Sequence, residues 1–188
     1  MMPSSPDASR TAVSRWRIAA WSAAALLLLV PLVAMQFTDD VDWTAFDFAF
    51  VTVLLLAVGV PLDLVMRRPG DWTYRAGAAV ALGTAFLVVW VNGAVGIVGA
   101  EDSGVNLLLY VVLAVGVVGA VLARFRPHGL ARAMAATALA QAAVAVGALV
   151  TAGASMVTVE VVALAGLVGL WSLSALCFRA AARRQAGA

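Results

Sequence analysis

Polar side chains are rare in this chain, and seven of them lie at matching ends of long apolar stretches, where they could form one site. They are Asp47, Asn92, Glu101, Asp102, Asn106, Tyr110 and Glu160. A polar group inside a hydrocarbon layer is costly unless it is paired or solvated, so a layer of such groups could line a vestibule for a solute or ion. The carboxylates of Glu101, Asp102 and Glu160 could instead act as a general acid and base.

Several of these residues also fit a purely structural role at the start of a helix. Thr44 precedes Asp47 by three residues, a spacing that lets the two side chains cap a helix. Glu160 is expected in the first turn of its helix, where the helix dipole favours a carboxylate. Asn92 stands inside an apolar stretch, where its amide needs a partner such as a backbone carbonyl. A binding site and a set of helix contacts both remain open interpretations.

Two further polar features lie outside this layer. Gln141 stands near the middle of an alanine-rich stretch, and we expect its amide to form a hydrogen bond between helices rather than to contact a ligand. Asp63 precedes Arg67 by four residues, so the two can pair on one helix face. Together with Arg75 they form a predicted clamp at the ends of the apolar stretches opposite to the polar layer.

The sequence predicts no cofactor, no metal ion and no catalytic residue. His128 is the only histidine and Cys177 the only cysteine, so paired haem ligands and a His/Cys metal site are not expected. No phosphate-binding loop, dinucleotide fingerprint or nucleophile elbow is found. The basic residues do not form a cluster on a soluble surface, and no nucleic-acid partner is expected.

The elements that must position these groups are apolar helices. Hydrophobic residues make up 64% of the 188-residue chain and charged residues 12%, whereas soluble domains have roughly 45–50% and about 25%. This composition predicts an all-α polytopic membrane bundle of six transmembrane helices, each close to the ~20 residues that cross a bilayer. The predicted spans are residues 18–36, 46–66, 76–98, 105–123, 130–150 and 157–178. Residues 1–17 are predicted to be a disordered tail and residues 179–188 a second tail. The short connections predict that consecutive helices are antiparallel neighbours.

The charges are sorted between the two sets of span ends. All twelve basic residues are arginines and fall at one set of ends, whereas seven of the ten acidic residues fall at the other set. Arginine and lysine accumulate on the cytoplasmic side of membrane proteins. The sequence therefore predicts that both termini are cytoplasmic and that the polar layer faces outward.

Residues 90–102 read Trp-Val-Asn-Gly-Ala-Val-Gly-Ile-Val-Gly-Ala-Glu-Asp and are followed by Asn106-Leu-Leu and by Ala123-Arg-Phe-Arg126. This pattern resembles a family of small, uncharacterised bacterial multi-pass membrane proteins, over about residues 75–142. The family has an Asn-Pro-Ala-Asn-like turn after the acidic pair, where this chain has Ser103-Gly-Val-Asn106. The resemblance implies a bacterial inner-membrane protein and implies no activity.

Three classes of function remain open. A non-catalytic integral membrane subunit or scaffold is favoured by short loops and by small-residue faces, such as that of residues 133–147, which suit helix association. A transporter of a small solute or ion would use the polar layer as its vestibule, and a membrane enzyme would use the carboxylates of that layer. In each case we expect the lipid bilayer as the surroundings, and either a homo-oligomer or membership of a membrane complex.

Overall fold

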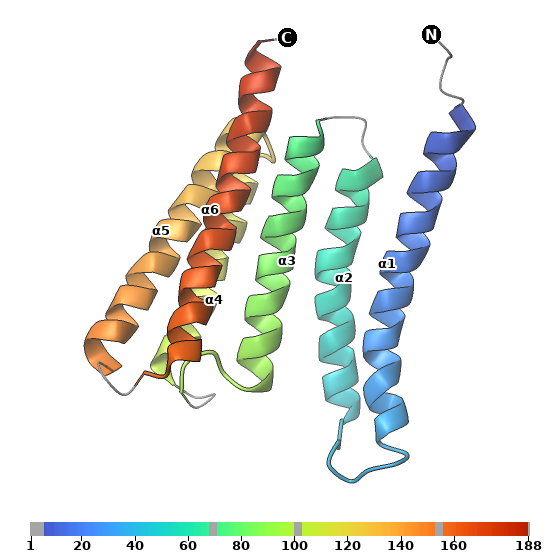
Figure 1. Ribbon diagram of the computed structural model, residues 1–188, viewed down its shortest axis with the longest axis vertical. Coiled ribbons are helices and arrows are strands. Elements are labelled where there is room, and N and C mark those ends of the chain that lie inside the picture. Colours follow the sequence, from blue (N-terminus) through green and yellow to red (C-terminus); the bar gives the residue numbers. More distant parts are fainter. Residues whose placement is uncertain (1–5, 68–70, 100–102, 153–155, 188) are drawn as a thin grey trace. The chain divides into compact units, whose positions relative to one another are not determined.

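A computed structural model describes residues 6–67, 71–99, 103–152 and 156–187. Over these ranges the chain forms six α-helices and no strand (Figure 1). The helices are α1 (Pro6–Ala34), α2 (Ala45–Arg67), α3 (Trp72–Ala94), α4 (Gly104–Leu122), α5 (Pro127–Ala152) and α6 (Thr158–Ala186). Each of them is long and apolar enough to cross a membrane. The predicted all-α, six-span architecture is confirmed, and the protein is a multi-pass membrane protein; the cytoplasmic placement of its termini stays a prediction.

The chain divides into two compact units, Met1–Arg68 and Pro69–Ala188. The first unit contains the hairpin of α1 and α2 (Figure 1). Few of its described side chains are buried, among them Pro31, Val51 and Leu54. Most of its apolar surface is therefore left for lipid or for other protein.

The second unit contains α3 to α6, and its helices do not pack in chain order. Helix α6 packs against α5 and α3, and α5 packs against α4, whereas α3 and α4 make few contacts with each other. The expectation that consecutive helices are neighbours is wrong for this pair. A connection limits how far apart two helix ends lie, but side-chain packing along the whole length decides which helices pair.

Small residues explain why α3 lies against α6. A Cβ added at Gly77 of α3 would stand 3.2 Å from the Cβ of Cys177 and from the ring of Phe178 on α6. The hydroxyl of Ser174 donates a 2.8 Å hydrogen bond to the carbonyl oxygen of Gly77. Close approach through small residues is the usual way in which helices associate within lipid. In the same manner, a Cβ at Gly119 of α4 would stand only 2.7 Å from the Cβ of Ala133 on α5.

Several helix ends differ from the predicted ones. Helix α1 already begins at Pro6, within the tail predicted as disordered, and α6 continues to Ala186 through the second predicted tail. Hydropathy marks where a chain enters lipid, but a helix can continue into water where the residues, such as alanine and arginine, favour it. Helix α3 begins at Trp72 and ends at Ala94, before the predicted end of its span. The backbone leaves the helix there, and Gly96 and Gly99 have φ values of +74° and +63° that glycine adopts readily.

Candidate functional site

The residues directly after α3, Val95 to Gly99, form a loop segment that lies partly inside the second unit. Ile97 and Val98 are only 9% and 7% exposed, and they belong to an apolar cluster that includes Leu109 and Leu164. A non-helical backbone placed among apolar side chains leaves its N–H and C=O groups without the bonds that a helix would supply. This segment therefore needs hydrogen-bond partners from elsewhere in the chain.

Asn106, in the first turn of α4, supplies most of these partners. Its Oδ1 accepts hydrogen bonds from the backbone N–H groups of Ile97 and Val98, both at 3.1 Å. Its Nδ2 donates to the carbonyl oxygen of Val98 at 3.2 Å. The side chain is almost fully buried, at 1% exposure. Asn92 of α3 donates from its Nδ2 to the carbonyl oxygen of Asn106 at 2.9 Å.

Two more side chains attach the loop segment to helix starts. Ser103 precedes α4 and accepts from the backbone N–H of Asn106, while its hydroxyl donates to the carbonyl oxygen of Val98 at 2.7 Å. Glu160, in the first turn of α6, accepts from the N–H of Gly99 at 2.8 Å and from the N–H of Val157 at 3.1 Å. The loop segment thus bridges the starts of α4 and α6, and a carboxylate stands where the helix dipole favours it.

Of the seven residues predicted to form the polar layer, the structure joins three, Asn92, Asn106 and Glu160, around the backbone of residues 95–99. Asp47 lies in the first unit, where its Oδ2 accepts from the backbone N–H and the hydroxyl of Thr44, both at 2.7 Å. The predicted Thr44 cap is confirmed. Tyr110 is 39% exposed on α4. Glu101 and Asp102 lie outside the described residues.

Two buried amides keep unused hydrogen-bonding capacity. The Oδ1 of Asn92 has no hydrogen-bond partner among the described residues, although Asn92 is 4% exposed. Gln141 of α5 is completely buried, and neither its Oε1 nor its Nε2 has a partner in the described part of the chain. The predicted hydrogen bond between helices from Gln141 is therefore not formed. Alanines flank it on both sides, and the hydroxyl of Thr137, four residues earlier, donates instead to the carbonyl oxygen of Ala133.

The predicted clamp is formed in part, and by a partner that was not predicted. Asp63 of α2 is 7% exposed and pairs with Arg67 at 2.5 Å and with Arg17 of α1 at 2.8 Å. A carboxylate near the C-terminus of a helix opposes the helix dipole, and two guanidinium groups offset this. Arg75 belongs to the second unit, and its pairing with Asp63 stays a prediction. The position of Arg17 at the start of the first span was the available signal, because an antiparallel hairpin places that end beside the end of α2.

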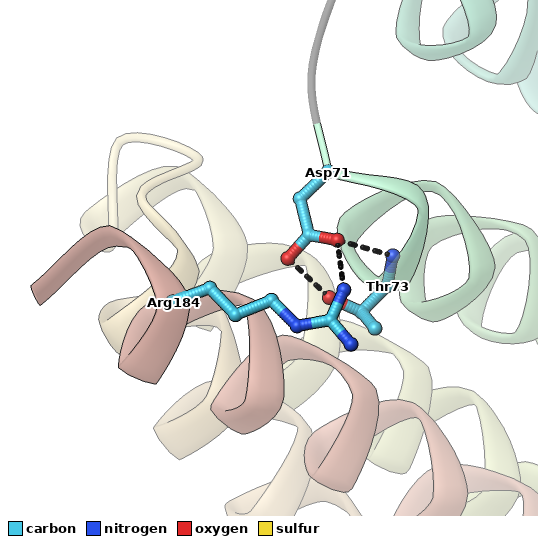
Figure 2. Close-up of polar contacts among 3 residues, drawn as sticks. All are labelled: Asp71, Thr73 and Arg184. Atoms are coloured by element: carbon cyan, nitrogen blue, oxygen red, sulfur yellow. Dashed lines mark hydrogen bonds and ion pairs between the residues drawn. The ribbon is translucent and has the colours of Figure 1, made fainter. Parts of the chain in front are cut away.

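A third ion pair, which no sequence pattern predicted, joins α3 to α6 (Figure 2). Asp71 caps α3 by accepting from the backbone N–H of Thr73 at 3.0 Å and from its hydroxyl at 2.6 Å. Arg184 of α6 pairs with the same carboxylate at 2.8 Å and lies 5.7 Å from the ring centroid of Trp72. The hydrogen bonds from Thr73, together with the Arg184 charge, lower the pKa of Asp71 below its ordinary value. The Asp-x-Thr spacing signals the cap, but no local pattern signals Arg184.

The chemistry that these groups can perform is limited. No group of three or more histidine, cysteine or acidic side chains within the described ranges could hold a metal ion. The amide and carboxylate groups around residues 95–99 bind backbone of the same chain, which holds a loop segment in place. Comparison with protein-family models, with curated proteins and with solved structures finds no match.

Proposed function

We propose that this protein is a non-catalytic integral membrane subunit or scaffold. The observation that carries the proposal is the use of Asn106: both of its amide atoms bind the backbone of Ile97 and Val98. Both carboxylate oxygens of Glu160 likewise accept from backbone N–H groups. Groups that would have to bind a solute or perform acid–base chemistry instead maintain the fold.

Outward-facing glycines support an association role. A Cβ added at Gly166 or Gly169 of α6, or at Gly147 of α5, would meet no atom within 4 Å, and all three residues are exposed. Glycine inside a helix costs about 1 kcal/mol relative to alanine, and these three make no close contact within the chain that would offset the cost. In lipid, a glycine surface lets another helix approach closely. Gly166 and Gly169 are therefore proposed to contact a partner helix.

The test is purification from native membranes in a mild detergent, with the stoichiometry of co-purifying proteins measured by mass spectrometry. We expect a reproducible partner at fixed stoichiometry, which is lost in the double variant Gly166→Leu/Gly169→Leu. Gly83→Leu is the matched control, since Gly83 on α3 also has no atom within 4 Å of an added Cβ. A protein that purifies without any partner, or a partner that the double variant retains, would contradict the proposal.

The unpaired amide of Gln141 favours a second candidate, a transporter of a small solute or ion. An unsatisfied buried amide costs about 1–3 kcal/mol, and a passing polar solute could offset this cost. Gln141→Met keeps the size of the side chain and removes the amide. A transporter loses flux in reconstituted vesicles with this variant, whereas a subunit keeps its partner and gains thermal stability.

We propose further that the protein resides in a bacterial inner membrane with both termini in the cytoplasm. The support is the sorting of all twelve arginines to one set of helix ends. The sequence resemblance over residues 75–142 points to the same location.

A further inference from the structure

A groove of about 830 Å³ runs along α5 and α6 within the second unit. Alanines line much of it, among them Ala135, Ala138 and Ala175, and the small side chains leave the space between the two helices open. Leu139 and Leu176 also line the groove and are 73% and 60% exposed. The groove is thus lined mainly by apolar side chains and is open to the surroundings of the bundle.

One end of the groove is strongly positive. Arg132 of α5 and Arg179 and Arg183 of α6 all line it, and all three are exposed. None of their guanidinium groups forms an ion pair or hydrogen bond with a residue that the structure describes. By contrast, Arg17, Arg67 and Arg184 each have a carboxylate partner. Three like charges lining one groove repel each other, so this end is suited to an anion.

The apolar part of the groove has about the length of one leaflet of a bilayer. Ala142 lies ten residues beyond Arg132 on α5, which corresponds to about 15 Å of helix. The hydrocarbon core of a bilayer is about 30 Å thick, so half of it matches this length. Between the arginines and the far end, the lining is apolar except for Ser172. A ligand that fits this lining has an anionic head and a hydrocarbon tail.

We propose that the groove binds an anionic phospholipid, whose phosphate lies against Arg132, Arg179 and Arg183 and whose acyl chain follows the alanine floor. Basic pockets between transmembrane helices recognise lipid head groups in this manner. A second protein helix could also pack on alanines, but it would leave the three arginines without an anion. Charge complementarity therefore selects the lipid. The site is separate from Gly166 and Gly169, which do not line the groove.

The test uses the full chain, purified and delipidated in a neutral detergent. Phosphatidylglycerol and phosphatidylcholine are added separately; bound lipid is measured by native mass spectrometry and the melting temperature by thermal unfolding. We expect phosphatidylglycerol to be retained and to raise the melting temperature, and phosphatidylcholine to do neither. Arg132→Gln/Arg179→Gln/Arg183→Gln should weaken binding on the order of a hundredfold, given the contribution of each basic residue near a membrane surface. Arg124→Gln/Arg126→Gln, in the connection between α4 and α5 and outside the groove, is the control and should bind normally.

A second variant tests the acyl chain separately from the head group. Ala135→Phe fills the groove and keeps all three arginines, and it should abolish retention of phosphatidylglycerol. Inorganic phosphate should not raise the melting temperature as phosphatidylglycerol does; if it does, the arginines bind a free anion and the lipid proposal is wrong. Equal retention of both lipids would overturn it as well. If Ala135→Phe lowers the oligomer mass but leaves lipid retention unchanged, a second copy of the chain occupies the groove and the lipid proposal is wrong.

Discussion

Asn106 shows how one side chain can determine the path of a buried loop backbone. Residues 97 and 98 bring apolar side chains into the core but carry peptide groups that no helix satisfies. An asparagine amide presents an acceptor and a donor side by side, which matches a peptide segment of two N–H groups and one C=O. The Asn106 side chain thus supplies hydrogen bonds that the backbone of residues 97 and 98 would have formed if α3 had continued.

The first prediction concerns this amide. Asn106→Leu keeps the branched shape of the side chain but leaves the N–H groups of Ile97 and Val98 unpaired, at a cost of about 1–3 kcal/mol for each unsatisfied group. We expect a clearly lower melting temperature in detergent. In a Cys177→Ser background, we also expect a cysteine placed at the buried position Ile97 to react faster with a soluble maleimide, because the loop segment is released.

Two further variants separate the amide from general packing. Asn106→Asp keeps the acceptor for the two N–H groups and loses the donor to Val98, so its destabilisation should be smaller than that of the leucine variant. Asn92→Leu removes a single hydrogen bond and should also have the smaller effect. If all three variants melt at the same temperature, the amide contacts do not hold the loop segment.

At the scale of helices, the contact between α3 and α6 is anchored at one end by Asp71 and Arg184. The carboxylate of Asp71 caps the start of α3, and the guanidinium of Arg184 near the end of α6 pairs with the same carboxylate (Figure 2). Along the helices, Gly77 and Ser174 provide close approach and a hydrogen bond. A polar anchor combined with small residues accounts for the pairing of two helices that lie far apart in the chain.

The second prediction is a pH dependence of stability. The pKa of Asp71 is lower in the folded protein than its ordinary value of 3.8. Its ionised form therefore stabilises the fold above about pH 4. This contribution is lost as the pH falls through the folded pKa. We expect the melting temperature to fall on acidification below about pH 4 and to fall less steeply in Asp71→Asn.

The control for this prediction is Arg184→Gln, which removes the charge partner and leaves the Thr73 cap. Because the hydrogen bonds from Thr73 are the largest cause of the lowered pKa, this variant should retain most of the acid dependence. Identical acid profiles in the wild type and in Asp71→Asn would show that the carboxylate is not responsible.

At the scale of the whole molecule, six apolar helices and the sorting of charge at their ends define a topology. The connection between α1 and α2 carries acidic residues, whereas the connection between α4 and α5 carries Arg124 and Arg126. The two connections should therefore lie on opposite sides of the membrane.

The third prediction is the orientation. In a Cys177→Ser background, a cysteine at Asp39 should react with an impermeant maleimide from the outer side of intact spheroplasts. A cysteine at Arg126 should react only after the membrane is permeabilised. Both positions are exposed in the structure. The reverse pattern would invert the topology, and equal reactivity of both positions would contradict an odd number of crossings between them.

The sequence by itself determined the properties that depend on neighbouring residues. Hydropathy predicted six spans because crossing a bilayer requires about 20 apolar residues in a row. The cap of Thr44 and Asp47 and the pair of Asp63 and Arg67 were predictable because spacings of three and four place these side chains together on a helix.

The tertiary structure decided the contacts between residues distant in the chain. Gly99 and Glu160 are 61 residues apart and Asp71 and Arg184 are 113 apart, so no local spacing indicates either pair. The end of α3 at Ala94, before the end of the predicted span, also depends on a tertiary contact. The loop segment that follows is stable only where Asn106 of the next helix forms hydrogen bonds with its backbone. Hydropathy alone continues the span through these residues, because Ile97 and Val98 are as apolar in a loop as in a helix.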